Sequence, residues 1–415
     1  MTTVTSSTHL APLIHETPSP SSAAKLLKMA FDGGDMRLLR GETIARLQSA
    51  PADAATLMNL CIVEQILGDP ASGLLHQAEA LRLHRLYRSS WPSTPQALRI
   101  LAFMTPGDIG SNTPIEFLLQ GSDSILYSLY VVPGEALPDP LPDHDIAIVI
   151  AGESDEVRPV MKEIERLIPT WRCTVLNRPG RVLRLSREDM HGILENVPGL
   201  TMPATVRIGR EDFEKVGRGL IRMEQVLESG ATFPLIARTI GSHAGRGLAK
   251  LDDGAAMDGY LRDHPTGAEF FISRYVDYRS SDGLFRKYRI VWVDGRPYPC
   301  HMAIGADWKV WYLNADMASS AAKRAEEEQF MSTFDDGFAR RHAEALAAAV
   351  ERFGLEYVGI DCAEMPDGRL LVFEGDIALV AHDMDPPDLY PYKGPQMRKV
   401  FTAFYDMLKR HAERQ

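Results

Sequence analysis

The sequence has few of the features that mark secreted, membrane or zinc-binding proteins. It has four cysteines, and none of them forms the paired CxxC spacing of a zinc ligand set: Cys61, Cys173, Cys300 and Cys362. Scattered cysteines are typical of free thiols in a cytosolic protein, so neither a disulfide framework nor a zinc site is expected. No apolar run approaches the roughly 20 residues of a membrane span. No basic residue precedes Lys25, so we expect no secretory signal.

An excess of positive charge is also lacking. The chain has 45 Lys and Arg against 56 Asp and Glu, which gives a net charge of −11. This balance argues against a broad nucleic-acid-binding face. The composition, with 45% hydrophobic and 24% charged residues among 415, is that of an ordinary globular protein of about two or three domains.

The first half of the chain changes its pattern twice. Residues 1–20 are rich in Thr, Ser and Pro and are expected to form a disordered tail. Residues 21–92 have helical periodicity, interrupted at Gly68-Asp-Pro70, and predict a small helical module. Residues 97–202 alternate short apolar strands with helices, which predicts a parallel α/β sheet.

Two turns of the predicted parallel sheet follow strands. Residues 105–113 and 152–155 lie where strands end. Ligands gather beyond the carboxyl ends of strands in such sheets, so these turns are candidates for a binding site. Ordinary tight turns are the alternative.

From residue 203 onwards the pattern is that of an α+β protein with antiparallel strands. A helix is expected over 211–228, and two hairpins are expected around Asp294-Gly295 and around Pro366-Asp-Gly368. This half of the chain therefore differs in kind from the parallel part before it.

A glycine-rich segment follows one of the predicted strands. The strand ends in the cation Arg238, and Gly241, Ser242, Gly245 and Gly247 come shortly after it. The backbone N–H groups of such a turn can bind phosphate, and the cation would lie beside the same phosphate. The segment is neither a P-loop nor a dinucleotide fingerprint. A plain glycine hairpin remains the alternative.

Three carboxylates occupy the last predicted hairpin. Glu374 and Asp376 are two positions apart and so face the same side of one strand, while Asp361 lies at a similar distance from the turn on the other. We therefore expect Asp361 nearly opposite Glu374. Carboxylates gathered in this way repel each other unless they are solvated or neutralised, and Mg²⁺ or Mn²⁺ prefers such oxygen ligands. A solvent-exposed acidic face is the alternative.

The glycine loop and the acidic hairpin, in this order, resemble the ATP-grasp superfamily, which includes glutathione synthetase, D-alanine–D-alanine ligase and ligases that add glutamate to a ribosomal protein. The resemblance covers roughly residues 97–410. It implies an α/β domain at 97–202, a small subdomain with the glycine loop at 203–276 and a C-terminal subdomain with the metal site at 277–415. The two subdomains would clasp ATP between them, and the helical module is not part of this common fold.

The resemblance also implies roles for individual residues. Those expected to bind the nucleotide are Arg187, Arg238, Gly241, Ser242, His243, Gly245, Gly247, Arg274 and Val276. Arg289 and Arg238 are the expected catalytic residues. Those expected to bind substrate are Arg289, Lys309 and Asn314, and the expected metal ligands are Asp361, Glu374 and Asp376.

This sequence departs from the superfamily pattern at three of these positions. Arg187 and Arg238 stand where the superfamily usually has lysines, and arginine keeps the charge needed for phosphate. Asp376 stands where an asparagine is usual and adds a negative charge. His243 on the loop is a candidate proton shuttle, with loop packing or a phosphate hydrogen bond as the alternative.

The resemblance implies an ATP-dependent carboxylate–amine ligase that uses Mg²⁺ or Mn²⁺. A carboxylate would attack ATP, and an amine would capture the acyl phosphate and form an amide, ADP and phosphate. A phosphotransferase or a non-catalytic nucleotide-binding scaffold remain alternatives. The expected partners are small amino-acid-like or peptide-like molecules, with no nucleic acid and no membrane. A cytoplasmic location is expected, and a homodimer is compatible with the resemblance.

Overall fold

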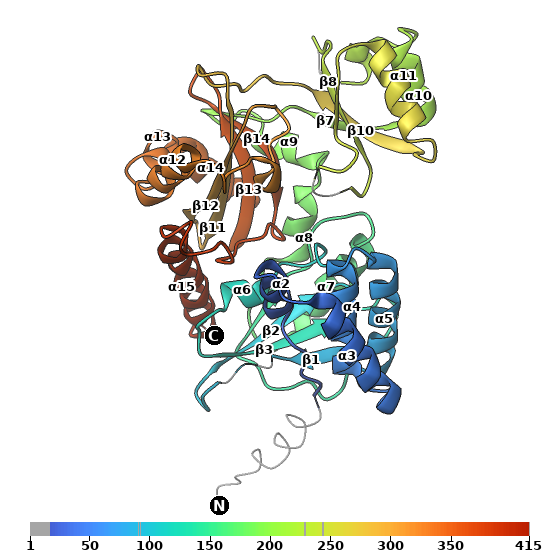
Figure 1. Cartoon of the computed structure of the whole chain (residues 1–415), viewed down its shortest axis with the longest axis vertical. Helices are drawn as coiled ribbons and strands as arrows, with labels where there is room; N and C mark the ends of the chain where they lie inside the picture. The colour runs from blue at the N-terminus through green and yellow to red at the C-terminus, as the bar shows by residue number, and fades with distance from the viewer. Residues whose placement is uncertain (1–16, 90, 92, 228–229, 243–244, 415) are drawn as a thin grey trace, which may run out of the picture.

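The chain folds into three β-sheets with helices packed against them. A computed structural model describes residues 17–89, 91, 93–227, 230–242 and 245–414. The sheets follow one another along the chain, and the second lies at one end of the molecule, farthest from the N-terminal helices (Figure 1). The first sheet is mainly parallel, and the other two are mainly antiparallel. The predicted order of an α/β part followed by two α+β parts is therefore confirmed.

The N-terminal module is helical, as predicted. Its helices are α2 (Ala23–Phe31), α3 (Met36–Ser49), α4 (Ala54–Ile66) and α5 (Pro70–Leu83). The last three each begin after an aspartate whose carboxylate accepts hydrogen bonds from free N–H groups of the first turn: Asp35, Asp53 and Asp69. Gly68, with a φ of 91°, ends α4 in the backbone conformation that glycine adopts most readily.

The prediction that the helical module runs to residue 92 is wrong at its end. Leu86–Arg88 forms a strand, β1, that pairs antiparallel with β3 (Ser124–Tyr130) at the edge of the first sheet. Tyr87 is buried between the module and the sheet, with its ring 5.9 Å from that of Tyr130. The middle residue of this short segment is buried and its two neighbours are half-buried, which is the alternation expected of a strand.

The first sheet has the strand order β1-β3-β2-β4-β5. Its remaining strands are β2 (Leu98–Met104), β4 (Ile146–Val149) and β5 (Val175–Leu176). The helical segments that follow its strands are α6 (Ile115–Leu118), α7 (Arg158–Leu167), η1 (Ile168–Thr170), α8 (Pro179–Val182), η2 (Leu183–Leu185) and α9 (Asp189–Leu194). The central strands are apolar and buried, as expected of a parallel sheet covered on both faces.

The second sheet has the order β7-β10-β8-β9, and all its pairs are antiparallel. Its elements are β7 (Thr205–Gly209), α10 (Arg210–Gly217), η3 (Met223–Gln225), β8 (Leu235–Thr239), β9 (Ala249–Leu251), α11 (Gly254–Asp263) and β10 (Glu269–Arg274). The helix predicted over 211–228 is too long, because Gly219 adopts a φ of 70° just beyond α10.

The third sheet has the order β12-β11-β13-β14-β6. Its strands are β6 (Leu200–Thr201), β11 (Phe285–Val293), β12 (Arg296–Gly305), β13 (Tyr357–Glu364) and β14 (Leu370–Asp376). The helical segments are η4 (Tyr312–Asn314), α12 (Ala321–Ser332), α13 (Phe338–Arg341), α14 (Ala343–Phe353) and α15 (Lys393–Ala412). Both predicted hairpins are confirmed. However, β6 lies within the predicted 97–202 domain and pairs with β14 instead.

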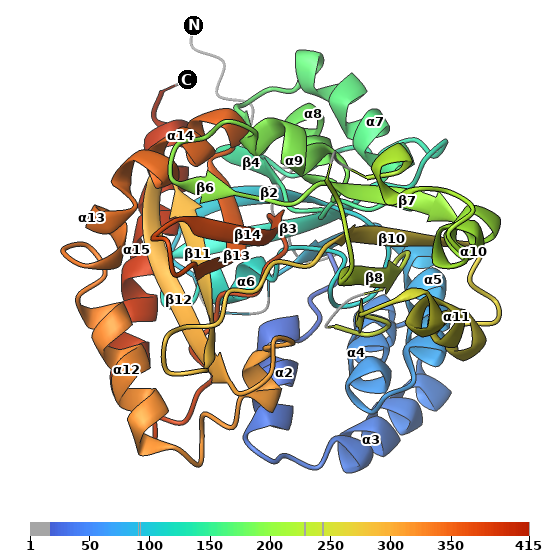
Figure 2. The ribbon, with the colours of Figure 1, turned by 90° about the horizontal axis from the view of Figure 1, so that it is seen from above.

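The first and third sheets share one hydrophobic core, whereas the second has its own. Phe103 of β2 and Val358 of β13 belong to the shared core, and Phe213, Tyr260 and Phe270 form the centre of the separate one. Figure 2 shows the second sheet beside the third, with connecting segments of the chain between them. No helix among the described residues is long and apolar enough to cross a membrane.

Asn177 connects the first sheet to the third. Its side chain donates to the backbone oxygen of Tyr357 at 2.9 Å and accepts from the N–H groups of Glu356 and Tyr357 at 3.1 and 3.0 Å. Its φ of 52° is left-handed, a conformation that asparagine tolerates better than most residues. The side chain is buried, so these hydrogen bonds form where water cannot replace them.

We expect Asn177→Ala to lower the free energy of unfolding by about 3 kcal/mol, because it leaves buried backbone groups without partners. Asn196→Ala is the matched control, since Asn196 also has a left-handed φ, of 59°, but is exposed. Urea unfolding of both variants measures the difference. Equal losses would show that backbone strain, and not the hydrogen bonds, causes the effect.

Candidate functional site

A row of ionisable side chains crosses one face of the third sheet. Arg289 of β11 lies between His301 of β12 and Asp361 of β13. Asp361 in turn lies opposite Glu374 of β14, so the predicted pairing of these two carboxylates is confirmed. Residues that face each other across strands point to the same side of a sheet. The row therefore brings together four side chains that are far apart in the sequence.

Asp361 is completely buried, and cations occupy both of its oxygens. Arg289 donates to it from Nε at 2.8 Å and from Nη2 at 3.0 Å, and the Lys287 ammonium lies 2.6 Å away. Burial by itself would raise the pKa of Asp361, but Arg289 and Lys287 hold that pKa well below its usual range. Asp361 is therefore a firmly ionised carboxylate in a closed ion-pair network.

Glu374 has a second set of cations. Arg187, between η2 and α9, donates to it at 2.5 Å, and Arg238 at the end of β8 lies 4.0 Å away. Burial opposes ionisation, but Arg187 lowers the pKa of Glu374 to about 2. Burial and the nearby Arg187 lower the pKa of Arg238 to about 10, which still leaves it charged at neutral pH. The two arginines predicted to bind phosphate thus lie together beside this carboxylate.

Asp376 is held differently from the other two carboxylates. It lies opposite Gly359, accepts from the N–H of Ala378 at 3.1 Å, and approaches Gly152 of the first sheet closely. Burial raises its pKa to about 6. No cluster of at least three His, Cys, Asp or Glu suited to a metal occurs in the described part of the chain. As arranged, with Asp361 fully engaged by cations, the carboxylates do not fit one metal ion together, and the metal site stays a prediction.

The glycine-rich segment folds back on Arg238. The Nε of Arg238 donates to the Ser242 hydroxyl at 3.0 Å, and that hydroxyl donates to the backbone oxygen of Thr239 at 2.7 Å. A side chain at Gly247 would collide with Thr239, and Gly247 also has a left-handed φ of 63°. The predicted position of the segment beside Arg238 agrees with the structure, while His243 lies outside the described residues.

The remaining predicted contacts lie around this loop. Lys309 donates to the backbone oxygen of Leu248 at 3.1 Å, so it contacts the loop and not Arg289. Asn314 bonds to the backbone of its own turn, at Lys309 and Trp311. Arg274 ends β10 and Val276 packs against the core of the other two sheets. Residues 274–276 therefore form a passage from the small subdomain to the rest of the chain.

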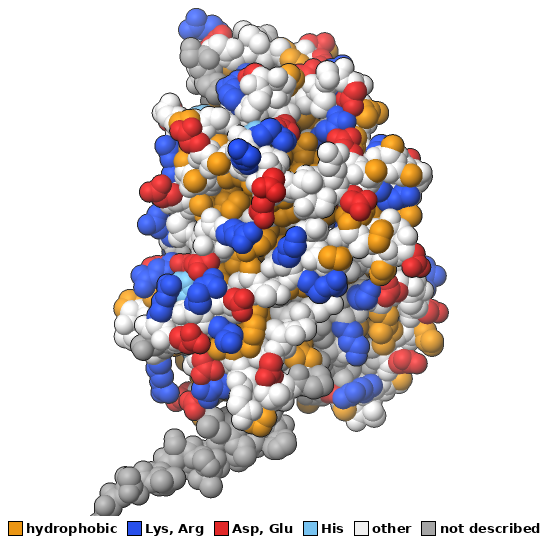
Figure 3. All heavy atoms as spheres, turned by 90° about the vertical axis from the view of Figure 1, so that its left-hand side faces the viewer, with side chains coloured by type: hydrophobic (Ala, Val, Ile, Leu, Met, Phe, Trp, Pro, Cys, Tyr) orange, Lys and Arg blue, Asp and Glu red, His pale blue; other side chains and the backbone are white. Residues whose placement is uncertain are grey.

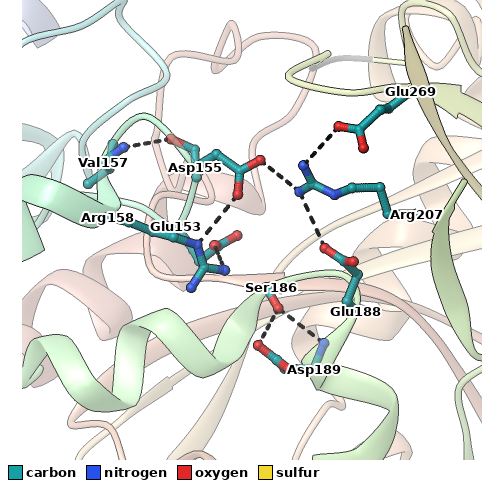
Figure 4. Close-up of polar contacts among 10 residues, drawn as sticks. Glu153, Asp155, Val157, Arg158, Ser186, Glu188, Asp189, Arg207 and Glu269 are labelled. Carbon is teal, nitrogen blue, oxygen red and sulfur yellow. Dashed lines mark hydrogen bonds and ion pairs between the residues drawn. The ribbon is translucent and has the colours of Figure 1, made fainter. Parts of the chain in front are cut away.

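A second ion cluster joins the small subdomain to the first sheet (Figure 4). Arg207 of β7 pairs with Asp155, in the turn after β4, at 2.7 Å, with Glu188 at 3.3 Å and with Glu269 at 3.5 Å. Glu188 directly follows Arg187, one of the two arginines predicted to bind phosphate. In the same turn, Glu153 pairs with Arg158 at 3.0 Å.

The polar segment after β14 is held by several buried side chains. Lys393 is buried and pairs with Asp385 at 2.9 Å and Glu327 at 3.1 Å, and Tyr392 donates to Glu327 at 2.6 Å. Burial lowers the pKa of His382 to about 4. These contacts fasten the segment to α12 and α15.

Sequence reasoning missed Lys287, His301 and Arg207. It marked the turn at 152–155, which contains Glu153, as a candidate binding turn without naming that residue. The register of the predicted hairpin around Asp294-Gly295 could have placed His301 opposite Arg289. Its Nδ1 is buried and has no hydrogen-bond partner among the described residues, and burial beside Arg289 holds its pKa well below the usual value. The sequence has no comparable signal for Arg207, whose partners come from three separate segments.

No protein-family model and no curated protein matches this sequence. Solved structures are similar to it, among them the D-alanine–D-alanine ligase of Bacillus anthracis complexed with ATP, at 14% identity and a TM-score of 0.44, over 77% of this chain and 98% of that one. An ATP-grasp protein with a RimK domain from Sphaerobacter thermophilus has 16% identity and a TM-score of 0.39, over 75% and 99%. The D-cycloserine synthetase DcsG has 13% identity and a TM-score of 0.42, over 74% and 99%.

The TM-scores of these similar structures are all below 0.5. The identities are low, so the side chains described above, and not the neighbours' activities, have to support a function.

On the face shown in Figure 3, positive and negative side chains are interspersed, and no broad basic patch covers this side.

The raised pKa of Glu153 predicts that the free energy of unfolding depends on pH. Burial raises its pKa from 4.5 to about 7, so its protonated form stabilises the fold below pH 4.5 and this contribution is lost as the pH rises through about 7. We expect Glu153→Gln to be equal to wild type in stability at low pH and more stable, by about 2 kcal/mol, above neutral pH.

Urea unfolding across this pH range tests the expectation. Glu163→Gln is the control, because Glu163 is half-buried on α7 and Arg166 lowers its pKa instead. A gain of stability in the Glu153 variant that does not change with pH would contradict the shifted titration.

Proposed function

We propose that this chain is an ATP-dependent carboxylate–amine ligase that also requires a divalent cation, Mg²⁺ or Mn²⁺. The observation that carries the proposal is the convergence of four cations on one buried and one half-buried carboxylate: Arg187, Arg238, Lys287 and Arg289 around Asp361 and Glu374. The four positive charges outnumber the two negative charges of these carboxylates. They lie beside a glycine-rich segment. Such an arrangement suits a polyphosphate.

Three of the four cations have a place in the proposed reaction. Arg187 and Arg238 would orient the phosphates of ATP, since a guanidinium forms paired hydrogen bonds with phosphate oxygens. Arg289 would hold the substrate carboxylate while it attacks the terminal phosphate, and would then stabilise the oxyanion that forms when the amine attacks. The reaction releases ADP and then phosphate as the amide forms.

The glycine-rich segment would exclude water from the acyl phosphate. Its side-chain and backbone contacts to Arg238 couple its position to the phosphates. Water would otherwise hydrolyse the intermediate before the amine arrives. The separate core of the small subdomain supports this part of the proposal, because that subdomain can change position without disturbing the core of the other two sheets.

An assay of ADP formation tests the proposal. The protein is incubated with ATP, Mg²⁺ or Mn²⁺ and panels of amino acids and small carboxylic acids, with hydroxylamine as a trap for acyl phosphate. We expect ADP together with a hydroxamate or an amide. Formation of AMP would exclude this route, and a stable phosphorylated product in mass spectrometry would indicate a phosphotransferase.

Arg238→Met should weaken ATP binding by about tenfold or more, because it removes a buried charge-assisted contact to phosphate. Arg262→Met is the control, since Arg262 is exposed on α11 of the same subdomain. Calorimetric titration with ATP measures both affinities. Equal affinities in the two variants would place the phosphates elsewhere.

A further inference from the structure

The ion pairs of Asp361 conflict with its predicted role as a metal ligand. Both oxygens already accept from cations, with Arg289 at 2.8 and 3.0 Å and Lys287 at 2.6 Å. A divalent cation at these oxygens would lie within a few ångströms of two positive groups and be repelled by both. Asp361 can therefore bind a metal only after at least one of these cations has moved.

Glu374 shows the same conflict on the neighbouring strand. Its oxygen accepts from Arg187 at 2.5 Å and lies 4.0 Å from Arg238. The cations suited to phosphate and the carboxylates suited to a metal are thus each other's partners in this structure. An anionic ligand that pairs with the cations would leave carboxylate oxygens free.

We infer that the site works by exchange of ion partners, in which Lys287 and Arg289 block Asp361 against divalent cations until an anionic ligand draws them away. The inference rests on the proposed ATP site, but not on which reaction follows. Metal binding would then depend on the bound nucleotide or substrate, and the site would not hold a cation in advance.

Lys287 is the positioning residue in this exchange. It lies two residues before Arg289 on β11 and so points to the same face, and its ammonium is the closer of the two cations to Asp361. A merely structural Lys287 would stabilise the fold without controlling the affinity for metal.

The test measures binding of Mn²⁺ alone to the full chain by electron paramagnetic resonance, without nucleotide. Lys287→Gln keeps a hydrogen-bond donor for Asp361 but removes the charge, and should bind Mn²⁺ about tenfold more tightly than wild type. Lys287→Arg should remain as weak as wild type. Lys323→Gln is the matched control, because Lys323 bonds to the backbone oxygen of Ala315 and pairs with no carboxylate of the described residues.

The double variant Lys287→Gln with Asp361→Asn shows where the gained affinity resides. Loss of the gain in this variant supports the exchange at Asp361. The exchange is overturned if Lys287→Gln binds Mn²⁺ no better than wild type, or if the gain persists without the Asp361 carboxylate. Thermal unfolding verifies that each variant is folded. If Lys287→Gln is not folded, Lys287→Met takes its place.

A second measurement follows the anion side of the exchange in the presence of EDTA. Glu374→Gln should bind metal-free ATP about tenfold more tightly than wild type, because Arg187 and Arg238 lose their internal partner. Asp376→Asn removes a nearby charge that has no arginine partner in the described contacts, and should show a smaller gain. Equal gains would indicate general electrostatics and would overturn the exchange at Glu374.

These measurements separate the inference from the proposed function. The Mn²⁺ arm contains no ATP and no substrate, so its outcome does not depend on catalysis. Absence of ADP formation with every acid and amine would remove the ligase proposal, while a Lys287-dependent Mn²⁺ affinity would still establish the ion exchange. An active ligase with unchanged Mn²⁺ affinity in Lys287→Gln would remove the exchange alone.

Discussion

The burial of the Asp361 carboxylate is the constraint on which the rest of the site depends. A fully buried charge is tolerated only when opposite charges and hydrogen bonds surround it, and Arg289 and Lys287 supply both. This network ties β11 to β13. Because Glu374 lies directly opposite Asp361 on β14, the same network also fixes where Arg187 and Arg238 find their partner.

The row across the third sheet takes its partners from all parts of the chain beyond the helical module. Arg187 comes from the segment that leaves the first sheet, and Arg238 comes from the end of a strand in the second. Arg207 stands beside this arrangement and connects the small subdomain to Asp155 and Glu188. Glu188, the residue after Arg187, is paired with Arg207 of the small subdomain. A ligand that moves Arg187 would therefore also act on this contact.

Two residues of the site change its balance of charge in opposite directions. Asp376 adds a negative charge on β14, and Lys287 adds a positive one two residues before Arg289 on β11. Burial raises the pKa of Asp376 to about 6. The ion pairs of Asp361 instead hold its pKa well below the usual range.

The sequence by itself determined the elements and the pairs that lie close along the chain. Alternating apolar residues and the turns at Asp294-Gly295 and Pro366-Asp-Gly368 were enough to place both hairpins and to set Asp361 opposite Glu374. Only the tertiary structure decided that Leu86–Arg88 joins the first sheet, that Arg207 bridges three segments and that Lys287 and Arg289 occupy Asp361. Local patterns record hydrogen bonding and burial within a segment, but the partner of a buried charge depends on which distant segments the shared core brings together.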